Sequence, residues 1–243
     1  MSAQDLFRAG KLNEAIQALG AELRDRPDDV QRRTFLFELL CFVGEYSRAE
    51  KHLTLLSDSN EDAAMGGLLF RSALKAERAR REFFEGKQYA DASPVANTLS
   101  GTLNGEPFTT IEDIDPRLGA RLEFFIAGEY MWLPLAHIGT LEMGPPRYLR
   151  DLLWASATII GGPVLDGKEF GEVLLPVLYP FSSSHASDSV KLGRETDWTW
   201  SDKESIDIPF GQKLFVLDGE RSIPILEIRE LKFAESLPEP SSN

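Results

Sequence analysis

The stretch EDIDPRLG, residues 112–119, stands where a helical sequence gives way to a strand-rich one. Its two aspartates, Asp113 and Asp115, have a spacing at which carboxylates can hold a divalent cation. The same letters also suit one short turn of helix, because Asp115 is a good N-cap, Pro116 fits the first helical position and the final glycine suits the exit. The stretch therefore has two interpretations: a metal site, or a turn that leads the chain into the strand RLEFFIAG.

The residues before this stretch repeat with a period of 34. Gly10 and Gly44 fit the turns between paired helices, and Ala15 and Ala49 let the two helices of each pair approach closely. A period of 34 residues with small side chains at these positions is typical of tetratricopeptide repeats (TPR). We therefore expect a TPR-like helical repeat domain over residues 1–93.

A third helical segment, NEDAAMGGLLFRSALKAERARREFFEGKQ, follows the repeat. Its pattern predicts one long amphipathic helix that caps the stack and ends at Gly86. One side is apolar, and the other carries the basic residues Arg71, Lys75, Arg78, Arg80 and Arg81. These side chains either form a solvated face or dock onto the acidic second half of the chain.

After Pro94 the sequence becomes strand-rich, with turn signals at Asn104 and Asp218, each followed by glycine. We expect six to eight strands and one or two short helices, one of which begins at the prolines of GPPRYLRDLLWASA. The fold class is thus α+β: the helical domain is followed by a mostly antiparallel, barrel-like domain over residues 94–233. We expect FSSSHASDSV to be a flexible loop and residues 234–243 to be a disordered tail.

Charge and composition restrict the possible partners. The net charge is -13, and residues 91–243 hold 12 Lys and Arg against 24 Asp and Glu, so this half should repel nucleic acid and anionic membranes. No apolar run reaches the length of about 18 residues that a membrane span needs. The start MSAQDLFRAG has no secretory signal, and the single cysteine, Cys41, excludes an internal disulfide. We expect a cytoplasmic protein.

Few residues offer chemistry. His52, His137 and His185 are scattered and show no metal-ligand spacing, and the sequence has no phosphate-binding loop, dinucleotide fingerprint or serine-nucleophile elbow. The remaining candidate is a metal-dependent enzyme that uses Asp113 and Asp115. An isolated pair of this kind is a weak motif, so we favour the structural interpretation and predict no catalytic residue, cofactor or metal.

An ordered series of motifs then resembles the ImpE/TagJ family of type VI secretion accessory proteins. The series is D-x-D-x-RLG, LE-x-x-x-x-G-x-Y-x-W-x-P, P-x-x-LRDL-x-W, P-x-x-YP, R-x-T-x-W and GQ. The resemblance covers roughly residues 1 to 233. This chain departs from the family in having Thr110 where a tryptophan is usual, and in lacking a helix pair before the strands.

The resemblance implies a non-enzymatic adaptor. Members of the family bind the N-terminal segment of the small sheath subunit, TssB, and are linked to ClpV, the ATPase that disassembles the contracted sheath. A helical repeat offers a groove for an amphipathic helix, which agrees with that role. The alternatives are the metal-dependent enzyme and a general helix-binding co-chaperone.

Two sets of residues follow from these considerations. The family motif residues form either a buried polar network or a direct partner contact: Asp113, Asp115, Arg117, Arg150, Asp151, Trp154, Arg194, Trp198 and Gln212. Arg117 and Arg150 are the expected partners of the two motif aspartates. Candidate contacts for the bound helix are apolar side chains that otherwise form the core of the repeat: Phe7, Leu36, Leu39, Leu40 and Phe83. In the second half, the aromatic residues Tyr130 and Trp132 are the alternatives.

Overall fold

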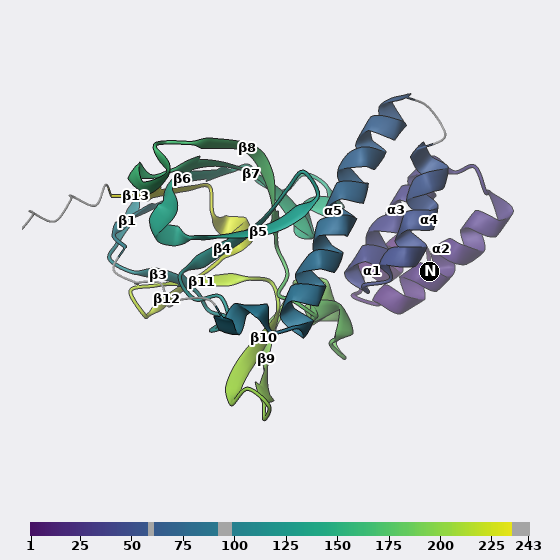
Figure 1. Cartoon of the computed structure of the whole chain (residues 1–243). Coiled ribbons are helices and arrows are strands. Elements are labelled where there is room, and N and C mark those ends of the chain that lie inside the picture. Colours follow the sequence, from purple (N-terminus) through teal and green to yellow (C-terminus); the bar gives the residue numbers. More distant parts are fainter. Residues whose placement is uncertain (58–60, 92–98, 235–243) are drawn as a thin grey trace, which may run out of the picture.

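The computed structural model describes residues 1–57, 61–91 and 99–234, with helices first and strands after them (Figure 1). The helices of the first half are α1 (Ala3–Arg8), α2 (Leu12–Asp25), α3 (Val30–Phe42), α4 (Tyr46–Ser57) and α5 (Glu61–Glu85). None of the described helices is both long and apolar enough to cross a bilayer. The helical first half and the strand-rich second half agree with the expected α+β class.

The 34-residue period corresponds to two similarly built helix pairs, α1 with α2 and α3 with α4. The turn glycines Gly10 and Gly44 have φ of +76° and +70°, a left-handed conformation that favours glycine. Ala15 and Ala49 are fully buried, because the paired helices pass close to each other at these positions. Helix α5 ends one residue before Gly86, as predicted, and lies between the helix pairs and the strands (Figure 1).

The largest sheet has the strand order β2-β1-β13-β6-β7-β8-β4-β5, and each neighbouring pair is antiparallel. Its strands are β1 (Gly101–Leu103), β2 (Glu106–Phe108), β4 (Arg121–Ile126), β5 (Glu129–Pro134), β6 (Ile138–Met143), β7 (Trp154–Gly161), β8 (Glu169–Pro176) and β13 (Glu230–Phe233). The sheet is open, since β2 and β5 are its edges in the described part of the chain. The barrel-like expectation is therefore wrong.

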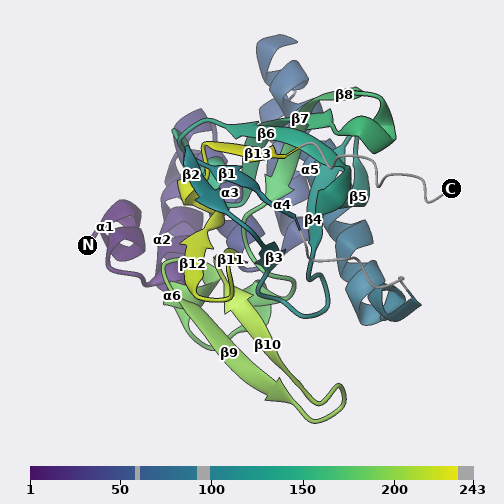
Figure 2. The same ribbon diagram turned by 90° about the vertical axis from the view of Figure 1, so that its left-hand side faces the viewer.

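Two smaller sheets complete the second half. One consists of β3 (Ile111–Asp113), β11 (Leu214–Leu217) and β12 (Arg221–Pro224), and the other is the hairpin β9 (Thr196–Ser201) with β10 (Ile206–Gly211). The hairpin projects away from the body of the molecule (Figure 2). The described ranges thus hold 13 strands, more than the six to eight predicted, because several strands have only three or four residues.

EDIDPRLG forms a single tight turn at the end of β3. The backbone N–H groups of Leu118 and Gly119 both donate to the carbonyl of Asp115, at 2.9 Å. Gly119 has φ of +57°, and the chain then enters β4. The turn predicted from Asp115, Pro116 and Gly119 is present, although it is too short to be a helix.

Short helices differ from the prediction in two places. No helix begins at the prolines of GPPRYLRDLL. The short helix of this stretch is the 3₁₀ helix η3 (Leu149–Leu152), which begins after them. FSSSHASDSV, expected to be a loop, contains the 3₁₀ helix η5 (Ser182–Ser184) and the beginning of α6 (Asp188–Lys191). The predicted boundary between residues 93 and 94 and the tail beyond Ala234 lie outside the described residues.

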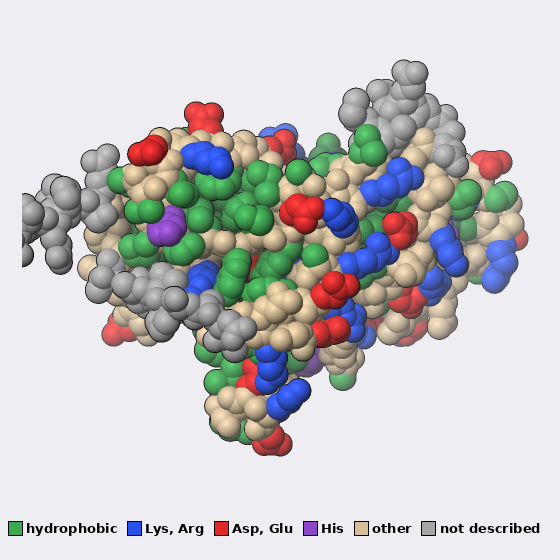
Figure 3. All heavy atoms as spheres, in the orientation of Figure 1, with side chains coloured by type: hydrophobic (Ala, Val, Ile, Leu, Met, Phe, Trp, Pro, Cys, Tyr) green, Lys and Arg blue, Asp and Glu red, His purple; other side chains and the backbone are tan. Residues whose placement is uncertain are grey.

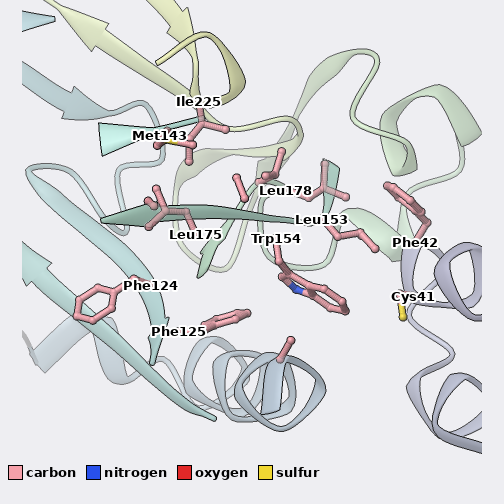
Figure 4. Packing of buried hydrophobic residues seen from close by; sticks show 14 of the residues in the cluster. Cys41, Phe42, Phe124, Phe125, Met143, Leu153, Trp154, Leu175, Leu178 and Ile225 are labelled. Carbon is pink, nitrogen blue, oxygen red and sulfur yellow. The ribbon is translucent and has the colours of Figure 1, made fainter. Parts of the chain in front are cut away.

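The hydrophobic core runs without interruption from the helices into the sheet. Cys41 and Phe42 at the end of α3 lie beside Leu153 and Leu178 of the strand-rich half, and Trp154 extends from there towards Phe125 (Figure 4). The two halves are therefore packed against each other through apolar side chains.

Candidate partner-binding site

Four charged side chains form a buried group at the boundary between the helices and the strands, which we call the ionic cluster: Arg80, Asp113, Glu123 and Lys213. Their side chains are at most 3% exposed. Lys213 Nζ lies 2.7 Å from Asp113 Oδ2 and 2.7 Å from Glu123 Oε2. The guanidinium of Arg80 donates to both carboxylate oxygens of Glu123, at 2.9 and 2.8 Å. Each buried charge therefore has an opposite charge beside it, as burial requires.

Further hydrogen bonds extend the ionic cluster towards the helices and towards the strands. Arg80 also donates to Glu77, at 3.1 Å, and to the carbonyl of Leu178, at 3.0 Å. The indole Nε1 of Trp154 donates to Glu77, at 3.2 Å, and the Tyr130 hydroxyl donates to Glu123, at 2.8 Å. Helix α5 is thus connected to strands β4, β5 and β7 through polar contacts as well as through the core.

The pKa values in the ionic cluster follow from burial and neighbouring charges. Burial raises the pKa of the Asp113 carboxyl to about 6, although Lys213 acts in the opposite direction. Burial would also raise the pKa of Glu123, but Arg80 and Lys213 outweigh it and hold that pKa well below the usual range. Glu123 is therefore the fixed negative charge of the cluster.

Asp115 forms a separate pair with Arg117. The guanidinium donates from Nε and NH2 to the two carboxylate oxygens, at 2.8 and 2.6 Å, and lies over the Phe84 ring at 4.9 Å. The expected pairing of Arg117 with a motif aspartate is thus present. The expected role of Arg150 is wrong, because Asp113 pairs with Lys213.

Both motif aspartates are occupied by cationic side chains of the protein itself. Asp113 and Asp115 are 2% and 0% exposed. Across residues 1–57, 61–91 and 99–234, no three His, Cys, Asp or Glu side chains are grouped so that they could hold a metal ion. The geometry of EDIDPRLG therefore supports the structural interpretation.

A second contact region joins the halves at residues 182–194, which we call the clamp segment. Asp188 Oδ2 accepts the backbone N–H of Leu12 at the start of α2, at 2.9 Å. Arg194 donates to the carbonyls of Phe7 and Arg8 at the end of α1, at 2.8 and 3.2 Å. A carboxylate at a helix N-terminus and a guanidinium at a helix C-terminus both complement the helix dipoles.

The clamp segment also meets the turn of the second helix pair. A Cβ placed on Gly44 would lie 2.6 Å from Ser183 Oγ, closer than real atoms approach. Gly44 therefore allows the turn between α3 and α4 to touch η5. Both turns of the 34-residue repeat thus rest on the segment that the sequence pattern described as a flexible loop.

An apolar groove of about 250 Å³, which we call the junction groove, opens where α1 meets the clamp segment. Helix α1 and the end of α3 form one wall, and the strand-rich half forms the other. The side chains and backbone of ten residues line it: Phe7, Phe42, Leu149, Leu152, Val177, Leu192, Gly193, Arg194, Gln212 and Leu226. It is the described surface that combines an apolar lining with several of the motif residues.

Motif residues shape this groove. The guanidinium of Arg194 lies over the Phe7 ring at 5.2 Å, and Gln212 Nε2 donates to the carbonyl of Gly193 at 3.0 Å. Asp151 Oδ2 accepts the backbone N–H groups of Arg147 and Tyr148, at 2.7 and 2.9 Å. That contact holds the start of η3, which presents its two leucines to the groove.

The motif residues therefore do not form one buried network. Asp113, Asp115, Arg117 and Trp154 are buried. The Arg150 side chain is 36% exposed, and its guanidinium lies over the Tyr148 ring at 4.2 Å. Trp198 is 43% exposed on the hairpin β9–β10, so its place in a buried network is a wrong prediction.

Beneath η3 lies a carboxylate that the motifs did not indicate. Glu38 of α3 is 7% exposed. Burial raises the pKa of Glu38 to about 7, Asp151 contributes to the rise, and the charge and backbone N–H of Arg150 oppose it. The lower side of the LRDL segment therefore rests on a group that titrates near neutral pH.

The candidate contact residues have different surroundings. Leu36, Leu39 and Leu40 are at most 2% exposed, so they belong to the core and cannot contact a partner. Phe83 packs edge-on against Tyr130 and Trp132, with ring centroids 5.3 and 5.0 Å apart. These three aromatic residues join α5 to β5.

Of these candidates, Phe7 alone lies in the junction groove. It is half-buried and packs edge-on against the Phe35 ring, with centroids 5.5 Å apart. The remaining groove residues come from segments that are far apart in sequence, so no local pattern connected them to Phe7.

The basic side chains of α5 serve both roles that the sequence allowed: some dock onto the second half of the chain, and others remain on a solvated face. Arg80 is buried in the ionic cluster, and Lys75 pairs with Glu129 of β5. Arg78 pairs with Glu50 of α4 at 2.7 Å, whereas Arg81 is exposed and contacts only Glu85 of its own helix among the ion pairs described. Figure 3 shows basic side chains along this helix beside acidic ones.

Sequence reasoning missed Lys213, Glu123 and Asp188. Lys213 follows the motif pair Gly-Gln, and Glu123 lies within the apolar strand RLEFFI, where a charged residue indicates a buried ion pair. Asp188 had no detectable signal, because the helix end that it caps is 176 residues away.

A family model and a curated relative point to the same family, and a solved structure has a similar fold. The family model described as ImpE protein matches residues 105–232. The type VI secretion system accessory component TagJ of Pseudomonas aeruginosa is 31% identical over 273 residues, which cover 96% of this chain and 91% of the relative. The crystal structure of protein VPA1032 from Vibrio parahaemolyticus has a TM-score of 0.81 at 26% identity, covering 97% of this chain and 98% of that one.

Proposed function

The chain belongs to the ImpE family, and from this premise we propose that it is a non-enzymatic adaptor of type VI secretion. In this proposal it works in the cytoplasm, binds the N-terminal segment of the small sheath subunit TssB in the junction groove, and links the sheath to the ATPase ClpV. The observation that carries the proposal is the convergence of Phe7, the LRDL leucines, Arg194 and Gln212 on one apolar groove.

The chemistry of the junction groove suits an amphipathic helix. Its lining is mainly apolar. Leucine-sized side chains of a bound helix would therefore be transferred from water into an apolar environment, which favours binding. Arg194 is more than a third exposed and stands at the rim, where it can meet an acidic group or the C-terminal carbonyls of the bound helix. Because its own contacts to α1 fix the guanidinium, little side-chain entropy is lost on binding.

The helical half supports the groove from below. We propose that the pairs α1–α2 and α3–α4 are TPR-like units and that residues 1–93 and 94–233 are two domains. In a TPR array, neighbouring units stack to make a continuous concave surface. Here the clamp segment takes the place of a further repeat, since it covers both inter-helix turns.

Titration calorimetry with a synthetic TssB N-terminal peptide tests the proposal. The intact protein is expected to bind the peptide with micromolar affinity or better. Leu152→Lys, which places a charge in the groove, should weaken binding at least tenfold. Leu69→Lys is the matched control, because Leu69 is 52% exposed on α5, away from the groove.

Three results would contradict the proposal: no heat change at high peptide concentration, equal loss of binding in both variants, or unchanged binding in Leu152→Lys. Circular dichroism of each variant establishes that the fold is retained. Unrelated amphipathic helices serve as competitors, and equal binding of all of them would favour the general helix-binding co-chaperone.

The link to ClpV is tested separately. The protein loaded with the TssB peptide is mixed with ClpV in analytical ultracentrifugation, and a ternary species is expected. If ClpV and the TssB peptide exclude each other on the protein, the protein cannot hold both at once and the linking role is wrong.

A further inference from the structure

The hairpin β9–β10 has two different faces. Residues that are paired across the hairpin share a face, so Trp198 lies beside Pro209, and Trp200 beside Asp207. On the opposite face, Phe210 packs against the His185 ring with centroids 5.5 Å apart. One face therefore contacts the body through Phe210, while on the other, the tryptophan face, Trp198, Trp200 and Asp207 are exposed and only Pro209 is buried.

The tryptophan face combines exposed indoles with carboxylates. Trp198 and Trp200 are 43% and 56% exposed, which is unusual for the largest apolar side chains. Trp200 Nε1 donates to Asp202 at 3.0 Å, so this indole has a fixed orientation, and Asp207 is exposed beside it. Aromatic rings next to carboxylates are the surroundings that bind Lys and Arg side chains.

The hairpin is held firmly enough to present this face. Glu204 in its turn accepts the Tyr89 hydroxyl at 2.6 Å and lies 3.2 Å from Lys87 Nζ. At the other end, the backbone N–H of Gly211 donates to Ser182 Oγ of η5 at 2.8 Å. Both ends of the projecting hairpin seen in Figures 1 and 2 are thus attached to the body.

Charge decides which kind of partner fits. Residues 194–211 hold five acidic residues against two basic ones, within a half of the chain that is strongly acidic. The segments outside the described residues, 58–60, 92–98 and 235–243, contain no Lys or Arg. These segments therefore cannot supply cationic side chains to the tryptophan face, which favours another molecule as its complementary partner.

We propose that the tryptophan face of the hairpin β9–β10 is a second binding surface, which takes a Lys- and Arg-rich segment of a partner protein. Cationic side chains lie over the indoles of Trp198 and Trp200, and Asp202 and Asp207 provide the opposite charge. This surface is separate from the junction groove, so the proposal stands or falls independently of TssB binding.

Fluorescence anisotropy with the full chain tests this proposal. The probe is a labelled 12-residue peptide of alternating Arg, Lys, Gly and Ser, compared with the same peptide carrying Gln in place of each basic residue. Trp198→Ala with Trp200→Ala keeps the net charge and is expected to weaken binding of the basic peptide about tenfold. Tyr148→Ala, which removes another exposed aromatic side chain, is the matched control and should bind like the wild type.

A second pair of variants separates local from overall charge. Asp207→Asn should weaken binding about threefold, whereas Asp166→Asn, which removes one charge elsewhere, should leave it unchanged. Trp198→Phe with Trp200→Phe keeps an aromatic hairpin if the alanine variant does not fold, and intermediate affinity is expected because the cation attraction of Phe is weaker.

Several outcomes would overturn the proposal. Equal binding by the wild type and the variant without the two tryptophans would show that overall acidity alone attracts the peptide. Binding of the Gln peptide as strongly as the basic one would remove the charge argument. Self-association in sedimentation that depends on the two tryptophans, without binding of the basic peptide, would assign the face to a second copy of this chain.

Discussion

Arg80 of α5 and Glu123 of β4 form a two-pronged ion pair across the boundary between the helices and the strands, with donor to acceptor distances of 2.9 and 2.8 Å. Both side chains are at most 2% exposed. Removing one partner from such a pair leaves the other as a buried, incompletely compensated charge.

Arg80→Met is therefore expected to lower the free energy of unfolding by about 3 to 5 kcal/mol. Arg81→Met provides the control on the same helix, because Arg81 is exposed and has only a surface ion pair with Glu85 and a cation contact over the Phe181 ring at 5.7 Å. Its cost should be about 0 to 1 kcal/mol. Urea unfolding followed by circular dichroism measures both, and similar values for the two variants would contradict the role of the ionic cluster.

The pH dependence of stability should contain a contribution from Glu38. Its pKa in the folded protein is about 7, above the ordinary 4.5. Folded molecules keep a proton there that unfolded molecules have released, so stability falls as the pH rises from about 4.5 to 7.

Glu38→Gln removes this fall. The variant should match the wild type near pH 4 and exceed it by about 3 kcal/mol at pH 8, because the pKa of Glu38 is raised from 4.5 to about 7 and each pKa unit corresponds to about 1.36 kcal/mol. Glu82→Gln, on the exposed side of α5, should show no such divergence. Denaturant titrations at both pH values decide, and parallel curves for Glu38→Gln and wild type would exclude a titration of Glu38.

Two glycines should respond in opposite directions to alanine. Gly44 has φ of +70°, and an added Cβ would meet Ser183 Oγ at 2.6 Å, so Gly44→Ala is expected to cost about 1 to 2 kcal/mol. Gly20 lies within α2 with nothing within 4 Å of an added Cβ, so Gly20→Ala should stabilise by about 0.5 to 1 kcal/mol. Thermal unfolding separates them, and a shift of the same sign in both would be inconsistent with this geometry.

Asp188 caps α2 with one carboxylate oxygen and accepts Lys191 Nζ at 2.9 Å with the other, so one substitution removes both contacts. Asp188→Ala should destabilise the protein by about 1 kcal/mol, the usual cost of losing an N-cap acceptor. Asp28→Ala, between α2 and α3, is an exposed control for the loss of one carboxylate. Hydrogen exchange of the first amides of α2 provides a direct measurement, since these amides should exchange faster in Asp188→Ala and remain unchanged in Asp28→Ala.

Local patterns predicted the parts of the fold that depend on nearby residues. The 34-residue period placed the turns at Gly10 and Gly44, because a left-handed turn needs glycine regardless of its surroundings. EDIDPRLG was interpreted correctly as a turn with Arg117 beside its aspartates, since the bidentate Asp115–Arg117 pair spans two residues.

Partners that lie far apart in the chain could not be predicted in this way. Lys213, which pairs with Asp113, is 100 residues further along, and β13 inserts between β1 and β6 although it is the last strand. The core position of Leu39 and its neighbours did have a signal in the sequence. Residues 36–42 of α3 are all buried, and six of the seven are apolar, the exception being Glu38. The candidate contacts Leu36, Leu39 and Leu40 therefore belong to the repeat core, which was the alternative for them.

The clamp segment has a consequence for how the polypeptide matures. The end of α1 and the start of α2 each receive a polar side-chain contact from residues 194 and 188, which leave the ribosome long after the helices themselves. Contacts of such sequence separation slow folding, because a long loop must close before they form. In the nascent chain, the first helix pair therefore lacks these contacts until the last quarter of the protein has been synthesised. Truncation before residue 188 should yield helices that fray at the turn around Gly10.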